Sequence, residues 1–419
     1  MNDTDVKRII LLSKVSTYRV RPFLEAARRL GIKVAQGIDM DPTLAEHWRT
    51  PLGLQFAEPQ QAAQKIVAFA REKPVQAIIS LDDSASEIAA LASAALGLPH
   101  NSSRAALAAR NKYEMRRLLS QAGVPCPEFT LYHVTADPDQ IAAAVSYPVV
   151  IKPTLLSGSR GVIRVNTPAE FRAAFLRVKH MLAGLAQGPG TTQILVETYL
   201  PGFEVALEGI LNRGRLKVLA LFDKPDPLEG PFFEETIYVT PSRLPESVQA
   251  AISDCTARAV VALGLHHGPI HAEMRVNQAG PWILEVAGRS IGGLCSETLH
   301  FGSDISLEEL ILRQAIGLDI EAFSREDQAK GVMMIPIPEA GILKGVEGIE
   351  EAKQTPLIDG VDITAQLNYP LLPLPEGDSY LGFIFASGRE PGEVEAALRQ
   401  AHQKLRFRLE AMLPLLAVG

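Results

Sequence analysis

Cysteine is scarce in this sequence, with three residues among 419, at Cys126, Cys255 and Cys295. None of them forms a CxxC pair or has the spacing of a metal site. So few cysteines exclude a small scaffold held together by disulfides. They are typical of a protein kept in a reducing compartment.

Long apolar runs and an excess of positive charge are also missing. The formal net charge is −7 at pH 7, and 21% of the residues are charged. No apolar run approaches the roughly 18 residues of a membrane helix, and the polar, acidic start is unlike a signal peptide. No broad basic field is present to hold a nucleic acid or an anionic membrane. We therefore expect a cytoplasmic protein that binds neither nucleic acid nor membranes.

Three common nucleotide-binding signatures are absent as well. The first predicted strand is not followed by GxGxxG, the chain has no GK[ST] sequence, and it has neither HRD nor DFG. The first absence argues against dinucleotide binding, the second against a P-loop and the third against a protein kinase.

The first hundred residues alternate between strand and helix patterns. Strands are predicted at 9–12, 33–35 and 77–80, and helices at 23–30, 62–70 and 87–96, which together indicate an open parallel sheet. Farther along the chain, short apolar runs separated by Gly, Asn or Pro turns predict antiparallel hairpins. The predicted fold class is thus α/β followed by α+β.

A glycine-rich turn follows the predicted strand 149–153, which carries Lys152. The turn has the sequence Ser157-Gly158-Ser159-Arg160-Gly161, and another strand follows it. Backbone N–H groups of such a turn can close over anionic oxygens, with Lys152 beside them. The alternative is an ordinary hairpin turn with a surface lysine.

Two glutamates are predicted to face each other across a hairpin. A three-residue turn at 278–280 sets a register that pairs Glu273 with Glu285. Directly opposed carboxylates repel each other, so they must share a proton, find cationic partners or hold a metal ion. Oxygen ligands favour Mg²⁺ over zinc. The alternative is an ion-pair cluster with Arg275 and Arg289.

Taken in chain order, these motifs resemble those of the ATP-grasp superfamily. The resemblance implies that Glu273 and Glu285 ligate Mg²⁺ (or Mn²⁺), although Ala287 stands where many relatives carry a ligating Asn. It also implies that Arg289 and Lys152 are catalytic, beside the transferred phosphate. The residues implied to bind ATP are Lys112, Lys152, Ser157, Gly158, Ser159, Gly161, Glu197, Tyr199, Leu200 and Glu204.

The same resemblance implies a domain organisation. An N-terminal Rossmann-like domain would span residues 1–105, and a small lid subdomain with the flap would span 106–195. A large subdomain with the metal site would span 196–325, and a C-terminal α+β lobe would span 326–419.

Within the superfamily the chain is most similar to the L-amino-acid ligases, which join a carboxylate and an amine through an acyl phosphate. That likeness places Glu235 at the amino group of an amino-acid substrate, and it assigns Arg289, Gly292 and Gly293 to the substrate site. Glu234 would point the opposite way in a strand, and a surface acidic pair is the alternative. Small carboxylates and amines are the expected partners, and a homodimer stays open.

Two other functions remain open at this stage. Purine-pathway ligases and biotin-carboxylase-type enzymes share the same motifs but use another acceptor. A nucleotide-binding module without activity is the second alternative.

Overall fold

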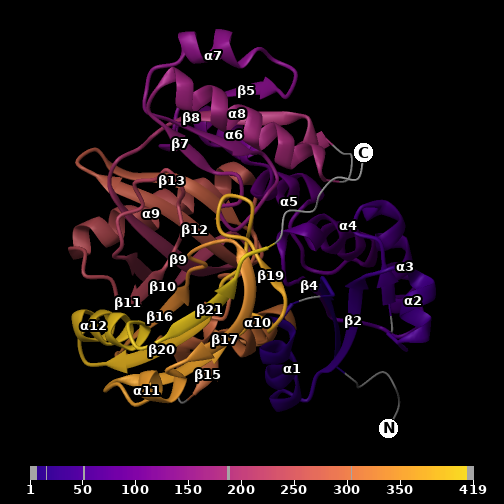
Figure 1. The fold of residues 1–419 in the computed structure, drawn as a ribbon. Coiled ribbons are helices and arrows are strands. Elements are labelled where there is room, and N and C mark those ends of the chain that lie inside the picture. The colour runs from indigo at the N-terminus through magenta and orange to yellow at the C-terminus, as the bar shows by residue number, and fades with distance from the viewer. Residues whose placement is uncertain (1–6, 16, 51, 186–188, 303, 413–419) are drawn as a thin grey trace.

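The computed structural model describes residues 7–15, 17–50, 52–185, 189–302 and 304–412. Figure 1 shows three bodies: an N-terminal domain on the right, a small domain at the top, and a larger body at the lower left that includes the C-terminal strands. Among the described residues, no helix is both long and apolar enough to cross a bilayer.

The N-terminal domain contains the predicted parallel sheet, in the order β3-β2-β1-β4. Strand β1 is buried along its whole length, because alternate residues enter two cores: Ile9 and Leu11 pack in one, and Ile10 and Leu12 in the other. Strand β3 and helix α2 were not predicted; they are too short to leave a periodic pattern. The elements are β1 (Arg8–Ser13), α1 (Val20–Arg29), β2 (Lys33–Asp39), α2 (Pro42–His47), β3 (Leu52–Leu54), α3 (Pro59–Glu72), β4 (Ala77–Ser80) and α4 (Ser86–Leu96).

The small domain is an antiparallel sheet in the order β5-β8-β6-β7, and its core packs against helices α7 and α8. Two helices connect it to the N-terminal domain, and Asn111 caps the second of them by accepting hydrogen bonds from the backbone of Tyr113 and Glu114. The glycine-rich turn connects β6 to β7. The elements are α5 (Ser103–Arg110), α6 (Lys112–Gln121), β5 (Phe129–His133), α7 (Pro138–Ala144), β6 (Val149–Pro153), β7 (Ile163–Val165), α8 (Pro168–Ala183) and β8 (Gln193–Thr198).

The large body is built on an eight-stranded antiparallel sheet in the order β13-β12-β9-β10-β11-β16-β20-β18. Its last three strands come from the C-terminal quarter of the chain and extend the sheet of the segment before it. The strands are β9 (Phe203–Asn212), β10 (Arg215–Lys224), β11 (Ile237–Thr240), β12 (Gly268–Asn277), β13 (Gly280–Ala287), β16 (Ala329–Ile335), β18 (Ile358–Ile363) and β20 (Gly382–Gly388).

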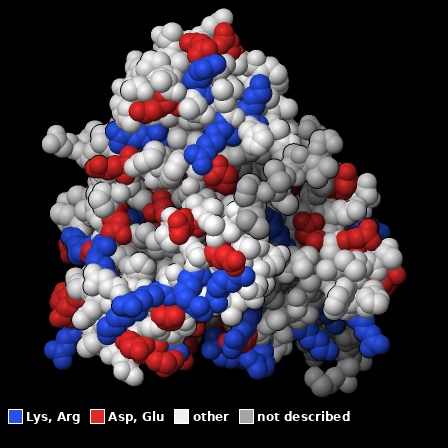
Figure 2. Space-filling view, in the orientation of Figure 1, with Lys and Arg blue, Asp and Glu red and all other residues white. Residues whose placement is uncertain are grey.

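Smaller elements complete the large body. A three-stranded sheet has the order β19-β17-β21, and β14 pairs with β15. On the face shown in Figure 2, basic side chains gather over the C-terminal strands with acidic ones among them. The elements are α9 (Glu246–Leu263), β14 (His300–Phe301), β15 (Ile305–Ser306), α10 (Leu307–Ala315), β17 (Gly341–Glu347), α11 (Ile349–Lys353), β19 (Pro370–Leu371), α12 (Pro391–His402) and β21 (Arg406–Glu410).

Candidate active site

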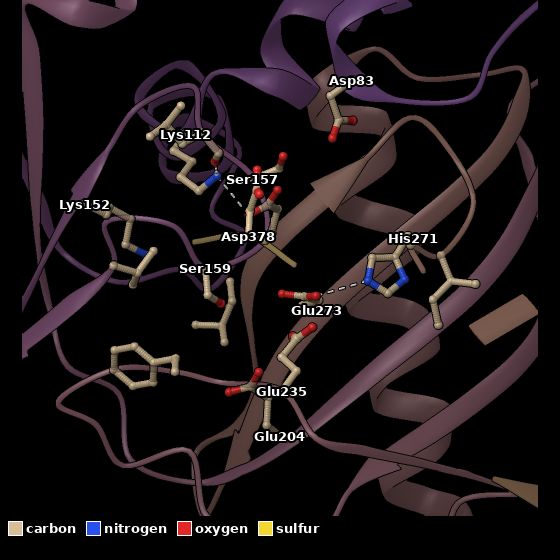
Figure 3. A pocket seen from close by; sticks show the side chains of 18 of the residues that line it. Asp83, Lys112, Lys152, Ser157, Ser159, Glu204, Glu235, His271, Glu273 and Asp378 are labelled. Carbon is tan, nitrogen blue, oxygen red and sulfur yellow. Dashed lines mark hydrogen bonds and ion pairs between the residues drawn. The ribbon is translucent and has the colours of Figure 1, made fainter. Parts of the chain in front are cut away.

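A cavity of about 300 Å³ is lined by residues of the N-terminal domain, the small domain and the large body. Figure 3 shows part of its wall, with acidic and basic side chains directed into the same space. Apart from Gly161, every residue that the sequence assigned to the site lines this cavity: Lys112, Lys152, Ser157, Gly158, Ser159, Glu197, Tyr199, Leu200, Glu204, Glu235, Glu273, Glu285, Arg289, Gly292 and Gly293.

The glycine-rich turn forms one side of the cavity. Gly158 and Ser159 have φ angles of 65° and 54°, so the turn uses the left-handed region that glycine adopts without strain. Gly161 lies outside the wall, and its N–H group donates to the carbonyl of Pro375 at 2.8 Å. A Cβ atom at Gly161 would lie 2.7 Å from the Pro153 ring. Gly161 therefore shapes the turn and is not placed to contact a ligand.

A buried ion triad lies beneath this turn. The ammonium of Lys152 is 2.6 Å from Glu197, whose other oxygen is 2.7 Å from the guanidinium of Arg116. Burial disfavours the ionised form of Glu197, but Arg116 and Lys152 hold the pKa of Glu197 below its ordinary value. Burial lowers the pKa of Lys152, and Glu197 opposes that effect. The triad fixes Lys152 at the cavity wall.

Removing the buried Arg116 should destabilise the protein more than removing an exposed arginine. Arg116→Met leaves Glu197 buried with one cation and removes the donor that the Leu284 carbonyl accepts from at 2.6 Å. We expect a loss of roughly 3–5 kcal/mol in the free energy of unfolding, measured in urea. Arg117→Met is the control, because the adjacent half-exposed Arg117 pairs with Glu114 at the surface and should cost less than about 1 kcal/mol. Equal losses in the two variants would contradict a structural role for the triad.

Glu273 and Glu285 are opposed across β12 and β13, as the sequence predicted. The predicted turn was wrong, however: Asn277 pairs with Gly280, so the loop has two residues and not three. A β-bulge at Leu284 adds one residue and restores the pairing of the glutamates. Arg116 supports this bulge through the Leu284 carbonyl.

Both glutamates have cationic neighbours. The ammonium of Lys112 lies 3.1 Å from Glu285, and Glu273 lies 3.4 Å from Lys224 and 3.1 Å from His271. Burial disfavours the charged imidazole, but Glu208 and Glu273 raise the pKa of His271 to about 9. The side chain of Glu273 is still 21% exposed, and that of Glu285 is 25% exposed. Two partly exposed carboxylates at opposed positions of a hairpin are ligands of the kind that a hard divalent cation takes, and the contact of Lys112 with Glu285 would change as such an ion binds.

Lys224 stands at the centre of a second acidic group. Oxygens of Glu204, Glu235 and Glu273 lie within 4.8 Å of one another. The ammonium of Lys224 is 3.0 Å from Glu204 and contacts Glu235. Burial disfavours the ammonium, but Glu235 and Glu273 raise the pKa of Lys224 well above its ordinary value. This group therefore holds a protein cation in the space that a metal ion would take.

Arg289 is held by the N-terminal domain. Its Nε atom is 2.9 Å from Asp83, and Arg19 donates to the hydroxyl of the adjacent Ser290 at 2.9 Å. Burial disfavours the guanidinium, but Asp83 and Glu285 raise the pKa of Arg289 above its ordinary value. Arg289 thus stays charged at the cavity wall, in an orientation set by a carboxylate from another domain.

Tyr199, Leu200 and Glu204, three of the residues implied to bind ATP, are linked by two arginines. The guanidinium of Arg164 lies 4.0 Å from the centre of the Tyr199 ring. The carbonyl of Leu200 accepts a hydrogen bond from Arg275 at 2.7 Å, and Arg275 also contacts Glu204 at 3.0 Å. Arg275 therefore connects the segment at Leu200 to β9.

Of the two adjacent glutamates in the 226–236 segment, Glu235 lines the cavity and Glu234 is not in its wall. The hydroxyl of Tyr238 donates to Glu235 at 2.9 Å, and Lys224 contacts its other oxygen. Burial and the neighbouring Glu273 raise the pKa of Glu235 to about 7, against the effect of Lys224. A ligand cation beside this carboxyl would favour its ionised form.

Several wall residues escaped the sequence analysis. Tyr18, Arg19, Asp82 and Asp83 follow β1 or β4, and ligands of parallel sheets bind beyond the carboxyl ends of strands, so this rule could have identified them. Lys224, which contacts Glu204 and Glu235, was assigned no role. Asp378 and Tyr380 belong to a C-terminal loop with no local signal. Apart from Lys224, all of these residues line the cavity.

Comparison with known proteins identifies related domains along the chain. Three family models match the chain: "ATP-grasp N-terminal domain" over residues 24–100, "ATP-grasp domain" over residues 145–298, and "L-amino acid ligase C-terminal domain 2" over residues 333–410. The crystal structure of an L-amino acid ligase from Bacillus licheniformis is 28% identical and superposes with a TM-score of 0.83. The match covers 97% of this chain and 99% of that one.

Curated relatives are also similar in sequence. The alanine–anticapsin ligase of Bacillus subtilis is 24% identical over 399 residues, which is 85% of this chain and 82% of that protein. Carnosine synthase 1 of Gallus gallus is 31% identical over 215 residues, or 49% of this chain. The chain spans 23% of that synthase and 61% of another curated relative. With the fold and the cavity described above, these matches show that the chain belongs to the ATP-grasp superfamily and is similar to its L-amino-acid ligases.

Proposed function

We propose that this protein is an ATP-dependent ligase that joins the carboxylate of one amino acid to the amino group of another. The carboxylate attacks the γ-phosphate of ATP, and ADP leaves. The amine then displaces phosphate from the acyl phosphate and forms an amide bond. The observation that carries the proposal is the convergence of Lys112, Lys152, Glu273, Glu285 and Arg289 on one cavity.

The difficulty of the first step is electrostatic, because the attacking carboxylate and the γ-phosphate are both negative. Positioning and charge neutralisation are the means by which proteins promote phosphoryl transfer. In our proposal, Lys112, Lys152 and the N–H groups of the turn at Ser157–Ser159 hold phosphate oxygens. Arg289 faces the reacting carboxylate and the oxyanion formed from it.

Glu273 and Glu285 would hold Mg²⁺ or Mn²⁺. When bound, such an ion neutralises phosphate oxygens and orients them. The protein's own contribution is to keep these two carboxylates opposed. The bulge at Leu284 supports that arrangement from one side, and the contact of His271 with Glu273 supports it from the other.

Substrates can be identified by measuring ADP release with each common amino acid, singly and in pairs, followed by mass spectrometry of the products. We expect ADP and a dipeptide in equal amounts for at least one pair. ADP release with bicarbonate alone would favour a carboxylase-type enzyme. ATP binding without turnover across the whole panel would favour an inactive nucleotide-binding module.

Glu235→Gln should impair use of the amino-acid substrate more than binding of ATP. Glutamine keeps the size of the side chain but removes the charge that would attract an α-ammonium group. We expect the KM of the acid substrate to rise about 10- to 100-fold, as expected for the loss of one charge-assisted hydrogen bond. Glu234→Gln is the control, since Glu234 is not in the cavity wall. Equal effects of the two substitutions would contradict the assignment.

A cytoplasmic location and a homodimer stay predictions. The first is based on composition, and the second can be measured by the mass of the protein in solution.

A further inference from the structure

A loop of the C-terminal part of the chain closes one end of the cavity. The carbonyl of Pro375 accepts from the Gly161 N–H at 2.8 Å, and the carbonyl of Glu376 accepts from Arg160 at 2.8 Å. Arg177 of the small domain donates to both oxygens of Glu376, at 2.6 and 2.8 Å. These contacts fasten the loop to the glycine-rich turn from the outside.

The loop places one carboxylate inside the cavity. A Cβ atom at Gly158 would lie 3.3 Å from the Cβ of Asp378, so Asp378 packs directly on the turn. Figure 3 shows Asp378 beside Ser157, with Glu204 and Glu235 farther away in this view. Asp378 is therefore at the phosphate end of the cavity, whereas Glu235 belongs to the group around Lys224.

Asp378 differs from the other acidic residues of the wall in how weakly it is held. Its side chain exposes 58% of its surface, and among the described residues its ion-pair partner is Arg160, at 3.9 Å. Every other carboxylate in the described wall has a contact of about 3 Å or less: Asp82 with Ser84, Asp83 with Arg289, Glu197 with Lys152, Glu204 with Lys224, Glu235 with Lys224, Glu273 with His271 and Glu285 with Lys112. A carboxylate that no protein cation neutralises at close range can pair with a cationic ligand without first losing such a contact.

In the proposed reaction the incoming amine supplies such a cation. The acyl phosphate R–CO–OPO₃²⁻ and the ammonium R′–NH₃⁺ give the amide R–CO–NH–R′, HPO₄²⁻ and H⁺. The nitrogen lone pair forms the C–N bond, and phosphate leaves with the electrons of the C–O bond. The ammonium must therefore be held close to the phosphate end of the cavity before it loses its proton.

We infer that Asp378 binds the ammonium group of the amine substrate, which makes the C-terminal loop a part of the acceptor site. The inference rests on the proposed ligase function. It assigns the two amino-acid substrates to different carboxylates, with the acid at Glu235 and the amine at Asp378.

A comparison of two nucleophiles tests this assignment. The full chain receives ATP, Mg²⁺ and an equal mixture of the common L-amino acids, with or without excess hydroxylamine at mildly alkaline pH. Hydroxylamine is uncharged there and needs no carboxylate to hold it, so hydroxamate formation reports the acyl-phosphate step alone. The ratio of dipeptide to hydroxamate is the measured quantity.

Asp378→Asn is expected to lower this ratio about 10- to 100-fold, since one charge-assisted contact is lost. Glu376→Gln is the matched control, because it weakens the same loop outside the cavity and should leave the ratio unchanged. Asp378→Ser is a second neutral variant, and thermal unfolding checks that each variant folds. An unchanged ratio in Asp378→Asn, or an equal fall in Glu376→Gln, overturns the inference. If the wild-type chain forms neither product, the proposed function itself fails.

Discussion

Glu285→Gln is expected to lower ADP formation by about 100- to 1,000-fold. The substitution removes one of two opposed carboxylates and leaves the other to hold the divalent ion alone. A bound metal ion contributes several kcal/mol to transition states of this kind, and each 1.4 kcal/mol is tenfold in rate. The rate can be measured by coupled ADP release over a range of Mg²⁺ concentrations. A chelator should stop the wild-type reaction, and added Mg²⁺ should restore it.

The control for this variant is Glu114→Gln, which removes a carboxylate that pairs with Arg117 at the surface. It should retain wild-type ADP formation. Thermal unfolding of both variants separates a lost ion from a lost fold. Full activity of Glu285→Gln at ordinary Mg²⁺ concentrations would remove Glu285 from the metal site.

Lys152→Met is expected to raise the KM of ATP by about 10- to 100-fold. The ammonium of Lys152 lines the cavity beside the glycine-rich turn, and a charged hydrogen bond to phosphate contributes roughly 1.5–3 kcal/mol. Methionine preserves the length and the packing of the side chain. Arg116 still pairs with Glu197, so the buried carboxylate keeps one cation. The measurement is the ATP dependence of ADP release at saturating substrate.

Lys179→Met provides the comparison for Lys152→Met. Lys179 is exposed on α8 of the same small domain, so its loss changes the net charge equally without touching the cavity. The KM of ATP should not change in this variant. If both variants raised the KM alike, the effect would come from net charge and not from a contact with phosphate.

The carboxylate hairpin illustrates how sequence reasoning can reach a correct pairing through an incorrect turn. The alternation of residues identified both strands and the two inward carboxylates. The two-residue turn shifts the register by one residue from the prediction, and the bulge at Leu284 shifts it back. No local pattern signals that bulge, because Arg116 on a distant helix supplies the donor for its carbonyl.

In the N-terminal domain, by contrast, local patterns were enough to predict the longer elements. Strand β1 is buried along its whole length and the longer helices have regular apolar spacing, so β1, β2, β4, α1, α3 and α4 could be predicted from their own residues, whereas the short β3 and α2 could not. The large sheet could not, because β16, β18 and β20 come from a segment that the sequence analysis treated as a separate lobe. Pairing between distant strands leaves no mark in the spacing of residues within either one.

By itself the sequence determined the chemistry available to this protein: which strand carries Lys152, which turn is rich in glycine, and which hairpin presents two carboxylates. These are short-range features, set by periods of two or 3.6 residues and by turn preferences. Only the tertiary structure decided which of these groups share a cavity, that Asp83 holds Arg289, that the Gly161 N–H bonds to Pro375, and that Asp378 packs on the glycine-rich turn. Those outcomes depend on how separate domains pack, and that packing is set by contacts between residues hundreds of positions apart.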